Sequence, residues 1–116
     1  GFFLMVEGAQ IDWGGHDNDT DYLITELLDF DKTIGVALDF AAKNAETLVI
    51  VTADHETGGF TLSTDDGNYN KIKPTFSTGG HSATMVPIFA KGPGEENFGG
   101  IYKNTALFQK MMDIFK

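Results

Sequence analysis

The stretch Thr47–Gly59, TLVIVTADHETGG, decides the fold that the sequence predicts. Its first half is a short run of β-branched and apolar residues, which is typical of a strand buried in a parallel sheet. Asp54 and His55 follow at the strand end, where open α/β sheets bind ligands. A carboxylate and an imidazole there are a common pair of zinc ligands, although the same residues can also serve as a turn cap and a hydrogen-bonded polar side chain.

The composition is that of one acidic globular domain. Of 116 residues, 41% are hydrophobic and ten are Phe, which provides enough apolar material for one core. Eight basic and 17 acidic residues give a net charge of −9, which disfavours nucleic acid and anionic membranes as partners. The absence of cysteine excludes disulfides, thiolate metal sites and a cysteine nucleophile. No apolar stretch reaches the length of a membrane span.

A second apolar run, Phe2–Val6, also precedes a group of polar residues and has the content of a buried strand. Asp12 and His16 follow it four residues apart, a spacing that places both side chains on one face of a helical turn. Gly14 and Gly15 weaken a regular helix here and favour a turn that leads into a helix. Because the chain starts within the apolar run, without an initiator Met or a polar leader, we expect a piece of a longer protein.

The remaining periodicity predicts helices that flank a sheet. The order strand, helix, strand predicts a right-handed parallel βαβ unit, and hence an α/β fold with a mainly parallel sheet and flanking helices. The expected elements are strands at 2–6, 47–52, 60–64 and 86–90, a helix at 22–45 that can break near 29–31, an irregular segment at 71–77 because of Pro74, a loop at 97–104 and a helix at 105–116.

The three histidines of the chain each follow a strand end or a glycine pair, and two of them have an aspartate at a spacing suited to metal binding. Three protein ligands with an open position are the pattern of a catalytic zinc. Two metal ions about 4 Å apart would hold the attacking and leaving oxygens of a phosphoryl transfer, but spacing alone does not name the reaction. One partition of these residues is Asp12, His16 and His81 on a first zinc, Asp54 and His55 on a second, and Glu7 as an oxygen ligand for Mg²⁺.

Three segments of the chain resemble, in the same order, three metal-binding motifs of the alkaline phosphatase family. They are FLMVEGAQIDWGGHDND (Phe3–Asp19), TLVIVTADHETGG (Thr47–Gly59) and GGHSATMVPIFAKGPG (Gly79–Gly94). The segment LLDFDKTIGVALDFA (Leu27–Ala41) resembles the family's helix between the first two motifs. The resemblance covers nearly the whole chain. It implies that residues 1–116 are the C-terminal part of a single alkaline phosphatase-like catalytic domain.

The resemblance also implies a role for each metal. The first zinc would polarise the leaving group or activate water, the second would activate a serine that becomes phosphorylated, and the magnesium shell would orient a base or tune charge. Trp13 stands at a position that varies in the family, where it either packs or lines the phosphate pocket. The matching ligands are Asp12, His16 and His81 for the first zinc, Asp54 and His55 for the second, and Glu7 for the magnesium.

Two parts of the family's catalytic machinery have no match in this sequence. The family nucleophile lies in an Asp-Ser-Ala type of motif, and Ser82-Ala83 follows a histidine instead. All eight basic residues are lysine, and lysine cannot reproduce the two-pronged contact of arginine with phosphate. We therefore expect the intact protein to be a phosphate monoester hydrolase with two zinc ions and one magnesium ion, and this chain alone to be inactive.

Two other classes of function remain alternatives. A related superfamily enzyme, such as a phosphodiesterase, sulfatase or phosphomutase, would share the metal ligands and differ in its nucleophile. A stand-alone, non-catalytic metal-binding module would need only the zinc ligands. For the intact protein the family resemblance implies a phosphate monoester as substrate and a periplasmic or secreted location. It also allows the intact protein to be a homodimer.

Overall fold

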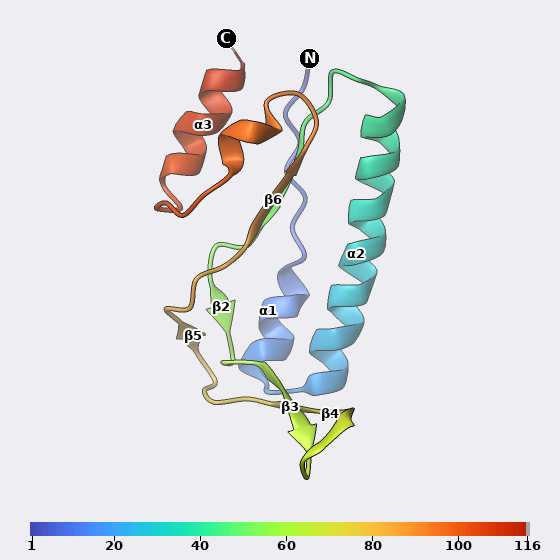
Figure 1. Ribbon diagram of the computed structural model, residues 1–116, viewed down its shortest axis with the longest axis vertical. Coiled ribbons are helices and arrows are strands. Elements are labelled where there is room, and N and C mark those ends of the chain that lie inside the picture. The colour runs from blue at the N-terminus through green and yellow to red at the C-terminus, as the bar shows by residue number, and fades with distance from the viewer. Residues whose placement is uncertain (116) are drawn as a thin grey trace. The chain divides into compact units, whose positions relative to one another are not determined.

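The computed structural model describes residues 1–115, which form two compact units, one of residues 1–31 and 55–85 and the other of residues 32–54 and 86–115. Helix α2 contributes residues to both units. The elements are α1 (Ala9–His16), α2 (Thr20–Lys43), β1 (Val49–Thr52), β2 (Glu56–Thr57), β3 (Thr61–Asp65), β4 (Asn68–Thr75), β5 (His81–Ser82), β6 (Ile88–Lys91), the 3-10 helix η1 (Glu95–Phe98) and α3 (Ala106–Ile114) (Figure 1).

The first unit joins α1 to the start of α2 and to two short antiparallel ladders, β2 with β5 and β3 with β4. The carboxylate of Asp19 accepts the backbone N–H of Tyr22 at 3.0 Å and so caps the N-terminus of α2. The Tyr22 hydroxyl donates to the side-chain oxygen of Gln10 at 2.7 Å, which ties α2 to α1. Leu23 is 6% exposed and provides the buried apolar contact of this unit.

One glycine joins the two ends of the segment that contains β3 and β4. The N–H of Gly58 donates to the carbonyl of Gly80 at 3.0 Å. The carbonyl of Gly58 accepts the N–H groups of Ser77 and Thr78 at 3.0 and 3.1 Å. Gly58 has φ = +87°, a conformation that favours glycine. The chain therefore leaves and returns at the same point, next to β2 and β5.

The second unit pairs β1 with β6 in antiparallel register and places η1 and α3 after them. Phe98 in η1 is 2% exposed and forms the centre of this unit's core. The Tyr102 hydroxyl donates to the carbonyl of Phe98 at 2.9 Å. Lys110 in α3 lies over the Tyr102 ring and donates to the carbonyl of Asn97 at 2.6 Å. These contacts hold α3 against η1.

No helix within residues 1–115 combines the length and apolar character needed to cross a membrane.

The predicted mainly parallel sheet is not the arrangement that this chain adopts. All three ladders formed by residues 1–115 are antiparallel, and β1 pairs with β6, which follows it in the chain. Phe2–Val6 lies in no helix or strand, and its side chains are 54–80% exposed. An apolar run does not show whether its residues find a partner strand, nor in which direction such a partner runs. The predicted parallel βαβ unit is therefore wrong for this chain.

The other elements lie within a few residues of their predicted bounds, with four exceptions. The strands expected at 47–52, 60–64 and 86–90 are observed as β1, β3 and β6, and the last helix as α3, whereas Lys116 at its predicted end lies outside the described residues. α2 continues without a break, Gly14 and Gly15 lie within α1, and η1 begins the predicted loop. Pro74 lies within β4 opposite Leu62. A two-stranded hairpin has two edge strands, and an edge tolerates proline.

Candidate metal centre

Helix α1 carries the first two predicted ligands on one face, as the four-residue spacing requires. His16 Nε2 lies 3.4 Å from Asp12 Oδ2. His16 Nδ1 lies 2.8 Å from the carbonyl of Gly79. A carbonyl only accepts, so Nδ1 carries the proton, and in the neutral ring Nε2 keeps its lone pair. This contact fixes His16 in the tautomer that can bind a metal through Nε2.

The glycine pair of α1 lets the helix approach its neighbours closely. Both glycines are buried. A Cβ added at Gly14 would lie 2.7 Å from the backbone nitrogen of Leu23, and one added at Gly15 would lie 2.9 Å from the carbonyl oxygen of Thr57. The pair that sequence reasoning treats as a helix breaker is thus a packing surface for α2 and β2. It sets how near α1 brings its ligands to His55, which directly precedes β2.

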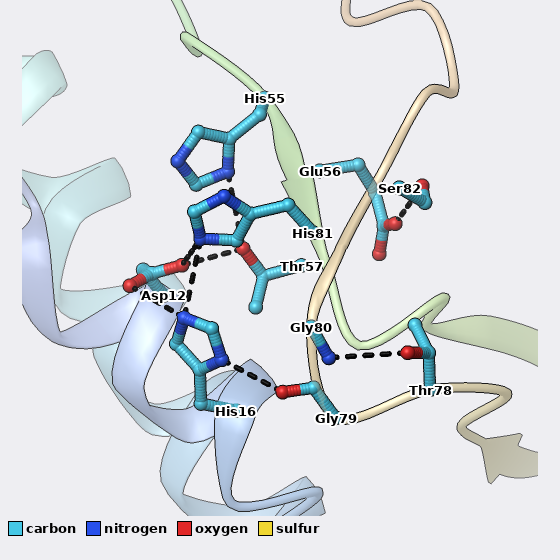
Figure 2. A network of polar contacts seen from close by, with 10 residues as sticks. All are labelled: Asp12, His16, His55, Glu56, Thr57, Thr78, Gly79, Gly80, His81 and Ser82. Atoms are coloured by element: carbon cyan, nitrogen blue, oxygen red, sulfur yellow. Dashed lines mark hydrogen bonds and ion pairs between the residues drawn. The ribbon is translucent and has the colours of Figure 1, made fainter.

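His81, at the start of β5, faces the α1 ligands. Its Nε2 lies 3.5 Å from Asp12 Oδ1 and 3.2 Å from His16 Nε2 (Figure 2). Two ring nitrogens this close need a proton or a cation between them, because two lone pairs repel. Nitrogens bound to one tetrahedral zinc at about 2.0–2.1 Å lie about 3.3 Å apart, so the observed 3.2 Å suits a shared ion.

His55 joins the same cluster from the segment before β2. Its ring stacks on that of His81 with centroids 3.5 Å apart and planes 20° from parallel. Asp12, His55 and His81 each offer one ligand atom, and these atoms lie within 4.8 Å of one another. Two imidazoles and a carboxylate are a donor set that zinc takes in proteins, so the residues present fit the metal implied by the family resemblance.

Thr57 is a part of the site that sequence reasoning missed. Its hydroxyl donates to Asp12 Oδ1 at 2.5 Å and lies 3.2 Å from His55 Nδ1. The single hydroxyl proton is used by Asp12, so His55 Nδ1–H donates to Thr57 in turn. The available signal was its position two residues after His55, because side chains two apart in an extended segment share a face.

Substitution of Thr57 by valine is expected to weaken zinc binding about tenfold, as the loss of an outer hydrogen-bond partner usually does. Valine keeps the shape of the side chain and removes only the hydroxyl that holds Asp12 and His55. Zinc dissociation constants measured by competition with a chelator would show the change. Thr57→Ser should retain near wild-type affinity, and equal weakening by serine and valine would contradict this role.

Three other predicted site residues lie outside this cluster. Glu7 and Asp54 are exposed, and neither belongs to the donor group that residues 1–115 gather. Glu7 precedes α1, whereas Asp54 is the last residue of its segment in the second unit and directly precedes His55. Trp13, one residue after Asp12 on α1, is 57% exposed. The structure thus brings together four of the five predicted zinc ligands, with His55 beside those predicted for the first ion.

Comparison with known proteins shows the family. A family model described as alkaline phosphatase matches residues 1–75. The chain is 56% identical, over 187 aligned residues, to alkaline phosphatase 3 of Bacillus subtilis, and the match covers all of this chain and 40% of that protein. The chain belongs to the alkaline phosphatase family. It spans less than half the length of this relative.

Solved structures show the same relationship in three dimensions. The alkaline phosphatase of the Antarctic bacterium TAB5 matches with a TM-score of 0.94 and 58% sequence identity. The match covers 97% of this chain and 35% of that one. A mutant of the same enzyme, with the same TM-score, identity and shares, has Mg bound in a site called M3. The chain therefore has the fold of the matching part of an alkaline phosphatase, although its own ladders are antiparallel.

Proposed function

We propose that the intact protein hydrolyses phosphate monoesters with the help of bound zinc and magnesium. The observation that carries this proposal is the convergence of Asp12, His16, His55 and His81 on one point, in a chain that belongs to the alkaline phosphatase family. The names of the relatives favour a phosphatase over the related phosphodiesterases, sulfatases and phosphomutases.

Asp12, His55 and His81 lie close enough to share an ion, but the family resemblance implies two zinc ions, so we assign Asp12, His16 and His81 to the first and His55 and Asp54 to the second. When bound, such ions act as Lewis acids toward phosphoryl oxygens and generate nucleophiles at neutral pH. The carbonyl of Gly79 orients His16, and the hydroxyl of Thr57 orients Asp12. These contacts hold the ligands in place before the metal arrives.

Glu7 is proposed as a magnesium ligand, and magnesium in a mutant of the TAB5 enzyme supports this metal. Trp13 is proposed to line the substrate pocket, because it is exposed on α1 next to a ligand.

We further propose that residues 1–116 are the C-terminal part of one catalytic domain. The exposed apolar side chains of Phe2–Val6 support this, since a complete domain would cover such a run.

The remaining parts of the activity would come from the rest of the intact protein. A serine nucleophile and an arginine for the phosphate are proposed to lie in a segment upstream of this chain, which contains no arginine. A periplasmic or secreted location and a homodimer follow from the family resemblance and are proposed on that basis alone. The acidic charge of −9 supports a partner other than nucleic acid.

Hydrolysis of an aryl phosphate tests both the metal requirement and the prediction that this chain alone is inactive. We expect the intact protein to hydrolyse it, to lose activity on treatment with EDTA, and to regain it when Zn²⁺ and Mg²⁺ are restored. The isolated 116-residue chain should show no turnover under the same conditions, because it lacks the nucleophile. Activity that survives full metal removal would contradict the proposed function, and turnover by the purified chain would contradict only its predicted inactivity.

A further inference from the structure

The ladder of β2 and β5 is only two residue pairs long, yet it carries the environment of two predicted ligands. Glu56 pairs with Ser82 and Thr57 pairs with His81. Side chains alternate between the two faces of a strand, and paired residues share a face. Thr57 and His81 therefore point toward the cluster of proposed metal ligands, whereas Glu56 and Ser82 point to the opposite face, as Figure 2 shows.

The face away from the histidines holds a connected set of hydrogen bonds. The Ser82 hydroxyl donates to Glu56 Oε2. The other oxygen of Glu56 accepts the backbone N–H of Phe60 at 3.1 Å, and Ser82 Oγ accepts the N–H of Thr84 at 3.4 Å. Glu56 and Ser82 are both half-buried, so water competes less for these bonds than it would at an exposed position.

The few backbone hydrogen bonds of such a short ladder are not enough to fix its register. A slip of one residue in a strand moves every side chain to the other face. Here that slip would turn His81 away from Asp12 and His55. The hydrogen bond between Ser82 and Glu56 forms when the two residues lie opposite each other, and a slip would break it. This bond therefore disfavours the slipped register.

We propose that Glu56 and Ser82 form a clamp that fixes the register of β2 against β5 and thereby positions His55 and His81 for metal binding. Both are positioning residues, since neither belongs to the donor group formed by Asp12, His55 and His81. This inference rests on the proposed metal centre. It adds that the two residues directly following the histidine ligands tune the centre from the far face of the ladder.

The test measures zinc affinity and the visible spectrum of the Co²⁺-substituted form in the intact protein. Ser82→Ala is expected to weaken zinc binding about tenfold and to change the Co²⁺ absorption bands, because outer contacts orient the ligands. Glu56→Ala should weaken it at least as much. The double variant should be no weaker than Glu56→Ala alone, because both changes break the same bond. Ser82→Thr, which keeps the hydroxyl, should restore affinity and spectrum.

A matched control exists in the neighbouring ladder. Thr61 and Thr75 are paired across β3 and β4 and share a hydrogen bond of 2.8 Å between their hydroxyls. Thr75→Ala removes a cross-strand bond between side chains, here between two hydroxyls, without a histidine beside it, and it should leave affinity and spectrum unchanged. The clamp is overturned if folded Ser82→Ala binds zinc like the wild type, or if Thr75→Ala has an equal effect. A wild type that binds no zinc would instead overturn the metal centre together with the clamp.

Discussion

Replacement of His81 by alanine is expected to lower the affinity of the intact protein for one zinc ion by more than about a hundredfold, because even the loss of an outer partner costs about 10–100-fold. His81 contacts both α1 ligands and stacks on His55, so its loss removes the group at the centre of the cluster. Calorimetric titration of metal-free protein with Zn²⁺ would measure the change. Hydrolysis of an aryl phosphate should fall in parallel.

All three histidines belong to the cluster, so the control for His81→Ala must be another residue of the same segment. Met85, four residues further along, is 76% exposed. Met85→Ala should bind zinc like the wild type. Unchanged zinc binding in His81→Ala would remove this residue from the first zinc site, whatever the activity of the variant.

The second large effect is expected from Gly15→Ala. The added methyl group would lie 2.9 Å from the carbonyl oxygen of Thr57, so α1 must move away from β2. Overpacking of this kind typically costs about 1–3 kcal/mol of unfolding free energy. The shift should also weaken zinc binding about tenfold, a loss within the usual effect of disturbed ligand orientation. Chemical denaturation and zinc titration would measure the two changes.

Gly35→Ala is the matched control, since Gly35 also lies within a helix. A Cβ at Gly35 has nothing within 4 Å, so alanine should raise the unfolding free energy by about 0.5–1 kcal/mol through helix propensity alone. Zinc binding should not change. A Gly15→Ala variant that is stabilised to the same degree would show that the α1–β2 contact is not tight.

Local spacing predicted which neighbouring side chains share a face, because that depends on the residues of one turn only. The four-residue step of Asp12 and His16 places them on one helical face, and the structure confirms that contact. The convergence of these residues with His81 depends on segments far apart in the chain. It became predictable through the family motifs, since periodicity does not show which strand ends meet.

The strand directions and the role of the glycine pair were not predictable in the same way. Leu48–Val51 indicates burial, but an apolar run fits a parallel or an antiparallel partner equally well. Gly14 and Gly15 lower helix propensity, yet tertiary packing against Leu23 and Thr57 outweighs that loss. In both cases the missing information is the identity of the neighbour, which local patterns do not contain.

Gly58 has a consequence for how this protein can change in length over evolution. Gly58 lies at the departing end of the β3–β4 segment, and its N–H and carbonyl bind the returning end at Gly80, Ser77 and Thr78, so the two ends stay together whatever lies between them. The entropy cost of closing a loop rises only slowly with its length. Insertions or deletions in the β3–β4 hairpin should therefore leave His55 and His81 in place. We therefore expect this hairpin to tolerate new surface while the centre stays the same.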